Sequence, residues 1–151
     1  MEDQQAIEAL MYAYCRAIDR GDFQTFSTLF AQAQWLVEGE TPSPASAQNV
    51  ILYQDGTPRT KHVVTNVETA VLDNGVSATG HSYVTVYQQV GPRPLEVIFV
   101  GEYFDQFVRE AGVWRFSRRD IRNPLYGDLS RHLRNPQATF PQAPRPPLPN
   151  L

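Results

Sequence analysis

Apolar residues recur every three or four positions from residue 3 to residue 18, which is the spacing of an amphipathic helix with one buried face. Gly21 follows this pattern and predicts the end of the helix. A second short helix is expected over 23–30, where phenylalanine and leucine side chains share one side. The pair Ser43-Pro44 is typical of a helix start and predicts a third short helix that reaches Tyr53.

The pattern then changes to long stretches rich in Val, Thr and Tyr, which favour strands. We predict strands over 61–73, 76–90, 95–109 and 113–122, after a short strand over 34–38. Asn74-Gly75 lies between the first two long strands and is a strong hairpin signal. Helices followed by an antiparallel meander predict an α+β fold, in which the helices pack on one face of a curved sheet. Long strands twist and coil, so this arrangement should enclose a cone-shaped cavity.

Length and proline content define the domain organisation. A chain of 151 residues is expected to form one domain with a substantial core. We assign residues 1–134 to this domain and residues 135–151 to a Pro-rich tail. The prolines should exclude regular structure from the tail, which is then either disordered or laid along a surface as extended chain.

Composition excludes several classes of partner. The formal charge is -3 and charges of both signs are interspersed. The sequence therefore contains no basic stripe of the kind that binds nucleic acid. The first residues lack the features of a signal peptide, and no apolar run approaches the ~20 residues of a membrane span. A cytoplasmic protein is therefore expected. The single Cys15 excludes an intrachain disulfide and a cysteine zinc site, and the three histidines show no metal-ligand spacing.

One acid and one histidine stand out as candidates for chemistry. Asp19 lies at the end of the first predicted helix, and His62 lies at the start of the first long strand. An Asp–His pair assembled from separate elements is sufficient for general-base catalysis. A neutral imidazole can take a proton from a carbon next to a carbonyl, while the carboxylate fixes its tautomer.

The predicted hairpin adds residues to this site. With a two-residue Asn74-Gly75 turn, Asn66 faces Tyr83 and His62 faces Tyr87 on one side of the sheet. Tyrosine and histidine clustered at one end are typical of a pocket wall, although a polar face is often simply solvated. A three-residue turn would shift this register.

A series of short motifs runs through residues 3–122. The motifs are Tyr14 with Asp19-Arg20-Gly21-Asp22, Leu29-Phe30, Thr60-Lys61-His62 with Asn66, Ala78-Thr79-Gly80, and Gly101-Glu102-Tyr103 with Gly112-Val113-Trp114-Arg115-Phe116. In this order they resemble the SnoaL-like branch of the ketosteroid isomerase-like, nuclear-transport-factor-type cone fold. The matching enzymes are of the scytalone dehydratase, lindane dehydrochlorinase and bile-acid dehydratase type.

The resemblance implies roles for individual residues. In those enzymes an Asp matching Asp19 supports a His matching His62. The bile-acid enzymes add a tyrosine that matches Tyr14 and an arginine near the end of the last strand. Arg122 is one match for this arginine and Arg118 is a rival, because the spacing differs by about one residue. Plain core packing of Tyr14 and surface ion pairs of both arginines are the ordinary alternatives.

Taken together, these features predict a cofactor-independent lyase or isomerase that acts on an apolar, oxygenated small molecule. A phenol such as Tyr14 or Tyr87 would donate to a developing enolate or a leaving hydroxyl. Scytalone dehydratase has a second histidine where Tyr87 falls, which argues against scytalone as substrate. His132 is expected to be inert. The predicted catalytic residues are His62, Asp19, Tyr14 and Arg122, and the predicted substrate-binding residues are Tyr87, Asn66, Tyr83 and Arg118.

Two alternatives remain open. One is an epoxide hydrolase or cyclase of the same fold, for which Glu68, Glu102, Asp105 and Asp120 are the candidate acids. The other is a non-catalytic binding or assembly subunit, like the small subunit of ring-hydroxylating oxygenases. The resemblance also implies self-association as a dimer or trimer.

Overall fold

The computed structural model describes residues 2–43 and 46–145 and confirms the α+β class. Pro44, predicted in the first turn of the third helix, and residues 146–151 of the tail lie outside the described residues. None of the helices in the described ranges is long and apolar enough to cross a membrane. The elements, in chain order, are α1 (Glu2–Arg20), α2 (Phe23–Leu29), β1 (Gln34–Val37), α3 (Ser46–Asn49), β2 (Thr60–Val71), β3 (Ser77–Gln88), β4 (Glu96–Glu110), β5 (Val113–Tyr126) and α4 (Pro136–Thr139).

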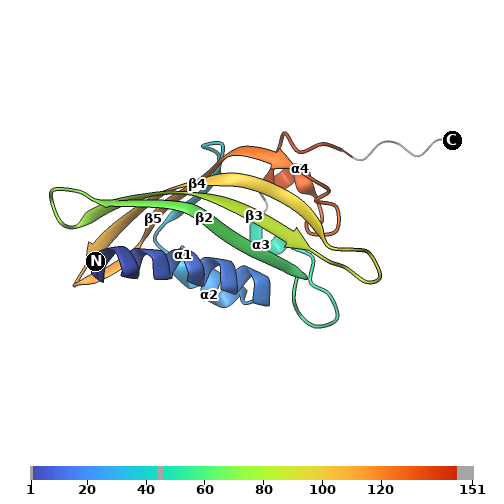
Figure 1. Cartoon of the computed structure of the whole chain (residues 1–151), viewed down its shortest axis with the longest axis horizontal. Coiled ribbons are helices and arrows are strands. Elements are labelled where there is room, and N and C mark those ends of the chain that lie inside the picture. The colour runs from blue at the N-terminus through green and yellow to red at the C-terminus, as the bar shows by residue number, and fades with distance from the viewer. Residues whose placement is uncertain (1, 44–45, 146–151) are drawn as a thin grey trace.

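The five strands form one curved sheet in the order β1-β5-β4-β3-β2. The four long strands are antiparallel neighbours, and only β1 runs parallel to its partner β5. Helices α1 and α2 lie along one face of this sheet (Figure 1). The predicted arrangement of helices on a coiled sheet is therefore the observed one.

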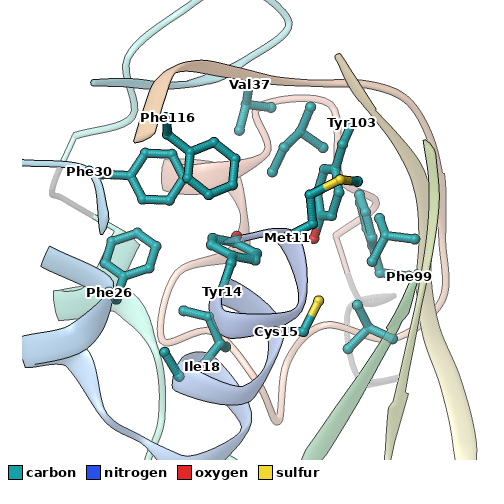
Figure 2. Close-up of a cluster of buried hydrophobic side chains, with 14 of the residues drawn as sticks. Met11, Tyr14, Cys15, Ile18, Phe26, Phe30, Val37, Phe99, Tyr103 and Phe116 are labelled. Carbon is teal, nitrogen blue, oxygen red and sulfur yellow. The ribbon is translucent and has the colours of Figure 1, made fainter. Parts of the chain in front are cut away.

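The core lies between α1 and the sheet. Helix α1 buries Ile7, Met11, Tyr14 and Ile18, which share one face at helical spacing. Figure 2 shows Tyr14 at the centre of this cluster, surrounded by aromatic rings from α2 and the sheet. Full burial of each large apolar side chain contributes about 1.5–3 kcal/mol, so this face alone holds the helix on the sheet.

The third helix is much shorter than the one predicted from the Ser43-Pro44 start. We predicted a helix that reaches Tyr53, but α3 covers only Ser46–Asn49. Val50 instead forms a β-bridge with Leu133, and the Ile51 amide donates to the His132 carbonyl at 2.9 Å. Pairing with a distant segment therefore replaced the local helical hydrogen bonds.

The Pro-rich segment is more ordered than we predicted. Regular structure was not expected after residue 134, but α4 forms there with Pro136 in its first turn, where a missing amide hydrogen costs nothing. Phe140 and Ala143 are buried in the core cluster. The packed part of the chain therefore continues to at least Ala143, at one end of the sheet (Figure 1).

The hairpin between β2 and β3 contains a β-bulge that the sequence did not reveal. Glu68 pairs with His81, in line with a two-residue turn, but Thr65, not the predicted Asn66, pairs with Tyr83. Asn66 has a positive φ of 53°. Two residues of β2 therefore oppose one residue of β3 here, and every pair beyond this point is shifted by one.

Candidate active site

The C-terminus of α1 positions Asp19. The helix ends in a Schellman motif, in which the Gly21 amide donates to the Ile18 carbonyl and the Asp22 amide donates to the Ala17 carbonyl. Gly21 has a φ of 70°, and a Cβ atom there would lie 2.3 Å from the Gly56 carbonyl oxygen. Only glycine fits this turn, which holds the end of α1 against the loop before β2.

Asp19 and His62 are in direct contact. The His62 Nδ1 atom lies 2.6 Å from Asp19 Oδ1, and the His62 backbone amide donates to Asp19 Oδ2 at 2.7 Å. The Thr60 hydroxyl donates to Asp19 Oδ1 at 2.8 Å. The exposed fractions of the two side chains are 8% for His62 and 12% for Asp19. The start of β2 is thus bound to the end of α1 through one carboxylate.

The charge of Asp19 determines the state of the imidazole. Burial raises the pKa of Asp19, but the hydrogen bonds and charge of His62 and the hydroxyl of Thr60 outweigh it and lower the pKa below its usual value. An ionised carboxylate only accepts hydrogen bonds, so the Nδ1 atom of His62 must carry the donated hydrogen. The Nε2 atom of neutral His62 is then unprotonated and free to accept a proton.

His62 borders a cavity of about 60 Å³ between the helices, the sheet and the C-terminal segment. Most of the wall is apolar or aromatic, and it includes Ile18, Phe26, Trp35, Val86, Phe99 and Phe140. The polar groups that reach it are few, as is usual for a small-molecule site. Such a wall suits a small apolar ligand with one or two oxygen atoms.

Tyr14 contributes a hydroxyl next to the histidine. Its ring centroid lies 6.5 Å from that of His62, and both residues line the cavity. The Trp35 indole donates to the Tyr14 oxygen at 3.2 Å, so the tyrosine's own proton is left for another acceptor. Burial raises the pKa of Tyr14, which keeps the phenol protonated and able to donate.

A buried ion pair packs against the ring of Tyr14. Arg119 forms two hydrogen bonds of 2.8 Å with Asp105, and both side chains are fully buried. The Arg119 guanidinium carbon lies 4.3 Å from the ring centroid of Tyr14 and 3.6 Å from that of Tyr103. Burial alone would lower the pKa of Arg119, but Asp105 raises it, so the cation persists under both rings.

Three predicted substrate-binding residues lie outside this cavity. Because of the bulge, His62 pairs with Val86 and not with Tyr87, which therefore falls on the opposite face of the sheet. Tyr87 borders a second pocket, whose lining includes Asp19 but not His62. Tyr83 is 43% exposed, and Asn66 occupies the exposed bulge itself. The prediction that these residues bind substrate beside His62 is corrected by this one-residue shift.

Neither predicted arginine reaches the cavity. Arg118 and Arg122 are partly exposed on the outer face of β5, where both contact Asp120. A β-bulge between Phe116 and Arg118 shifts the alternation along β5 by one residue and places Arg119 on the inner face instead. The prediction that Arg122 or its rival Arg118 faces the cavity is therefore wrong, and the inward-facing Arg119 contacts Tyr14 and Tyr103 but does not line the cavity.

Sequence reasoning missed His132, which lines the cavity from the C-terminal segment. Its ring centroid lies 6.2 Å from that of His62. Residues 127–134 carried no periodic signal, so no pattern placed this histidine near the pair. Phe140 and Leu133 from the same segment also line the cavity.

A family model described as a SnoaL-like domain matches residues 1–120. The chain belongs to the SnoaL-like domain family. No curated protein matches it significantly. The family assignment confirms the resemblance drawn from the motifs around Asp19 and His62.

Solved structures share the fold of this SnoaL-like protein at low sequence identity. A candidate scytalone dehydratase from Novosphingobium aromaticivorans is 19% identical with a TM-score of 0.60, over 83% of this chain and 88% of its own. Hexachlorocyclohexane dehydrochlorinase LinA-type3 from Novosphingobium barchaimii is 22% identical with a TM-score of 0.61, over 84% and 92%. The β subunit of a candidate aromatic-ring-hydroxylating dioxygenase from N. aromaticivorans is 16% identical with a TM-score of 0.59, over 84% and 90%. These similarities establish the fold.

Proposed function

We propose that this protein is a cofactor-independent lyase or isomerase that removes a proton from a carbon of a small, apolar, oxygenated molecule. The observation that carries the proposal is the 2.6 Å contact between Asp19 and the Nδ1 atom of His62 at the wall of an apolar cavity. This contact leaves Nε2 as the base. Structural neighbours named as a dehydratase and a dehydrochlorinase support elimination as the reaction type.

The proposed reaction begins with transfer of a proton from the substrate carbon to the Nε2 atom of His62. The electrons of the C–H bond move toward an adjacent carbonyl, whose oxygen gains negative charge and accepts a hydrogen bond from Tyr14. Asp19 stabilises the imidazolium, and His62 then returns the proton. Return to a different carbon gives isomerisation. Return to a departing hydroxyl, as its C–O bond breaks, gives elimination of water.

Proton abstraction can be tested without knowledge of the natural substrate. Exchange of the α-hydrogens of cyclohexanone in D₂O is followed by proton NMR, with and without the protein. We expect the wild type to accelerate exchange and His62→Gln to abolish the acceleration. His81→Gln is the matched control, because His81 lies on the outer face of the sheet and pairs with Glu102. Equal rates for His62→Gln and wild type would refute the assignment.

A non-catalytic binding or assembly subunit is the second candidate. Aromatic side chains fill much of the cone and leave a cavity of only about 60 Å³. One structural neighbour is the β subunit of a candidate oxygenase. A folded wild type that accelerates exchange of no small ketone would favour this role. No observation favours the epoxide reaction, since Glu68, Glu102, Asp105 and Asp120 are not among the residues that line the cavity.

A further inference from the structure

His132 lies nine-tenths buried in the cavity wall, at 8% exposure, and takes no part in the proton transfer described above. Its Nδ1 atom is buried with no hydrogen-bond partner among the described residues. A buried polar atom without a partner costs about 1–3 kcal/mol, and most such groups in native proteins are satisfied. The Nδ1 atom of His132 is closed off from the cavity, so a ligand can reach the imidazole only through the part of the ring that lines the cavity.

The segment that carries His132 is anchored on both sides of the ring. The Ile51 amide donates to the His132 carbonyl at 2.9 Å, and the Gln88 side chain donates to the Arg131 carbonyl at 3.1 Å. Leu133 forms a β-bridge with Val50. These contacts fix the backbone at residues 131–133, so the imidazole is held in the wall and is not part of a loose tail.

The ring of His132 faces the same space as His62. The two ring centroids are 6.2 Å apart and the ring planes are inclined by 63°. One small molecule in the cavity can therefore contact both imidazoles. Since the rest of the nearby wall is largely apolar, His132 offers a polar contact at a different point from the base.

The charge state of His132 limits its role. Burial and the neighbouring His62 lower the pKa of His132 to about 3, while Asp19 opposes the shift. The imidazole is then neutral at physiological pH and is a poor base. A neutral imidazole still offers one hydrogen-bond donor and one acceptor. It can hold an oxygen atom without repelling the imidazolium that forms on His62.

We propose that His132 is a second ligand-contacting histidine of this cavity, whose imidazole hydrogen-bonds a hydroxyl or carbonyl oxygen of a small ring compound while a carbon of that compound faces His62. This assignment rests on the proposed function, because it places the substrate in the same cavity. It adds the substrate class, a ring compound with an oxygen that His132 recognises, because aromatic side chains such as Phe26, Trp35 and Phe99 make up much of the wall.

The test compares two probes of nearly equal shape, phenol and toluene, which differ by a hydroxyl in place of a methyl group. Binding of each is measured by calorimetry with wild type, His132→Phe and His132→Gln. Phenylalanine fills the site and fits the apolar neighbours, while glutamine restores a polar group. We expect His132→Phe to weaken phenol binding at least tenfold, to leave toluene binding within threefold, and to leave the thermal midpoint near that of wild type. His132→Gln should recover part of the phenol affinity.

A ring-nitrogen readout completes the experiment. In protein labelled with ¹⁵N-histidine, saturating phenol should shift the His132 resonances and leave those of His81, on the outer face, in place. An equal loss of phenol and toluene binding in His132→Phe would mean a merely structural role and would overturn the proposal. So would unchanged phenol binding, or failure of wild type to bind either probe. Phenol binding through His132 without ketone exchange would refute the proposed function and leave this assignment standing.

Discussion

Replacement of Asp19 by asparagine removes one charge and leaves the side-chain shape almost unchanged. The carboxylate accepts three hydrogen bonds, of 2.6 and 2.7 Å from His62 and 2.8 Å from Thr60. An asparagine amide has one oxygen and one NH₂ group, so either orientation places a donor against a donor. If the NH₂ group faces Nδ1, the imidazole must carry its hydrogen on Nε2 and can no longer act as the base.

The size of the effect follows from the charges. An imidazolium and a carboxylate with charge centres about 4 Å apart attract each other by about 4 kcal/mol at an effective dielectric constant of about 20. Loss of this attraction in the transition state corresponds to roughly a thousandfold lower rate. Both side chains are nearly buried, so solvent screens the pair little.

The assay is the rate of cyclohexanone α-hydrogen exchange in D₂O at pH 7, for wild type and Asp19→Asn. Asp22→Asn is the matched control, because Asp22 caps α2 at Thr25 and asparagine is an equally good cap. We expect about a thousandfold loss of acceleration for Asp19→Asn and wild-type behaviour for the control. A folded Asp19→Asn protein with more than one third of wild-type activity would refute the role of the carboxylate.

The same variant makes a prediction about acid stability. Burial raises the pKa of Asp19, but its hydrogen bonds with His62 and Thr60 lower it overall in the folded protein. Such a carboxylate stabilises the fold above its unfolded pKa of about 4, and this contribution is lost as the pH falls through the folded pKa. In urea unfolding, Asp19→Asn should therefore lose less stability than wild type between about pH 5 and about pH 2. Parallel curves would contradict the lowered pKa.

Three further predictions concern the scaffold around the site. Arg119→Met leaves Asp105 buried without its partner and should lower the free energy of unfolding in urea by about 3–5 kcal/mol. A double variant with Asp105→Leu should recover most of this loss, and full stability of the single variant would refute a structural role for the pair. Gly21→Ala should reduce stability by at least about 1 kcal/mol and lower exchange activity, because the alanine Cβ meets a backbone carbonyl. Gly75→Ala is the control, since Gly75 has a similar φ but open space around it, so this variant reports the backbone strain alone. Asn49→Ala removes hydrogen bonds of 2.8 Å to the C-terminal segment and should speed proteolysis within residues 127–143, measured by mass spectrometry; an unchanged cleavage rate would show that other contacts hold the segment.

Local pattern determined the elements that could be predicted. The spacing of apolar residues predicted α1, and its glycine predicted the turn after it, because both depend on short-range geometry. The alternating strands and the Asn74-Gly75 turn placed β2 to β5 within a few residues. The candidate pair of Asp19 and His62 followed from family motifs at the ends of these elements, where side-chain direction is set by the cap and the strand.

The remaining features depend on tertiary contacts. The bulge at Asn66 shifted the β2–β3 register by one residue and left His62 on the face opposite to Tyr83 and Tyr87, since side chains alternate along a strand. The phase of β5 turned Arg119 inward, where Asp105 compensates its burial. Local sequence predicted α1, α2 and the five strands to within about four residues, but it predicted neither the short extent of α3 nor the presence of α4. Only the folded packing decided which face each side chain joins, and it brought His132 to the cavity through backbone contacts with residues about eighty positions away along the chain.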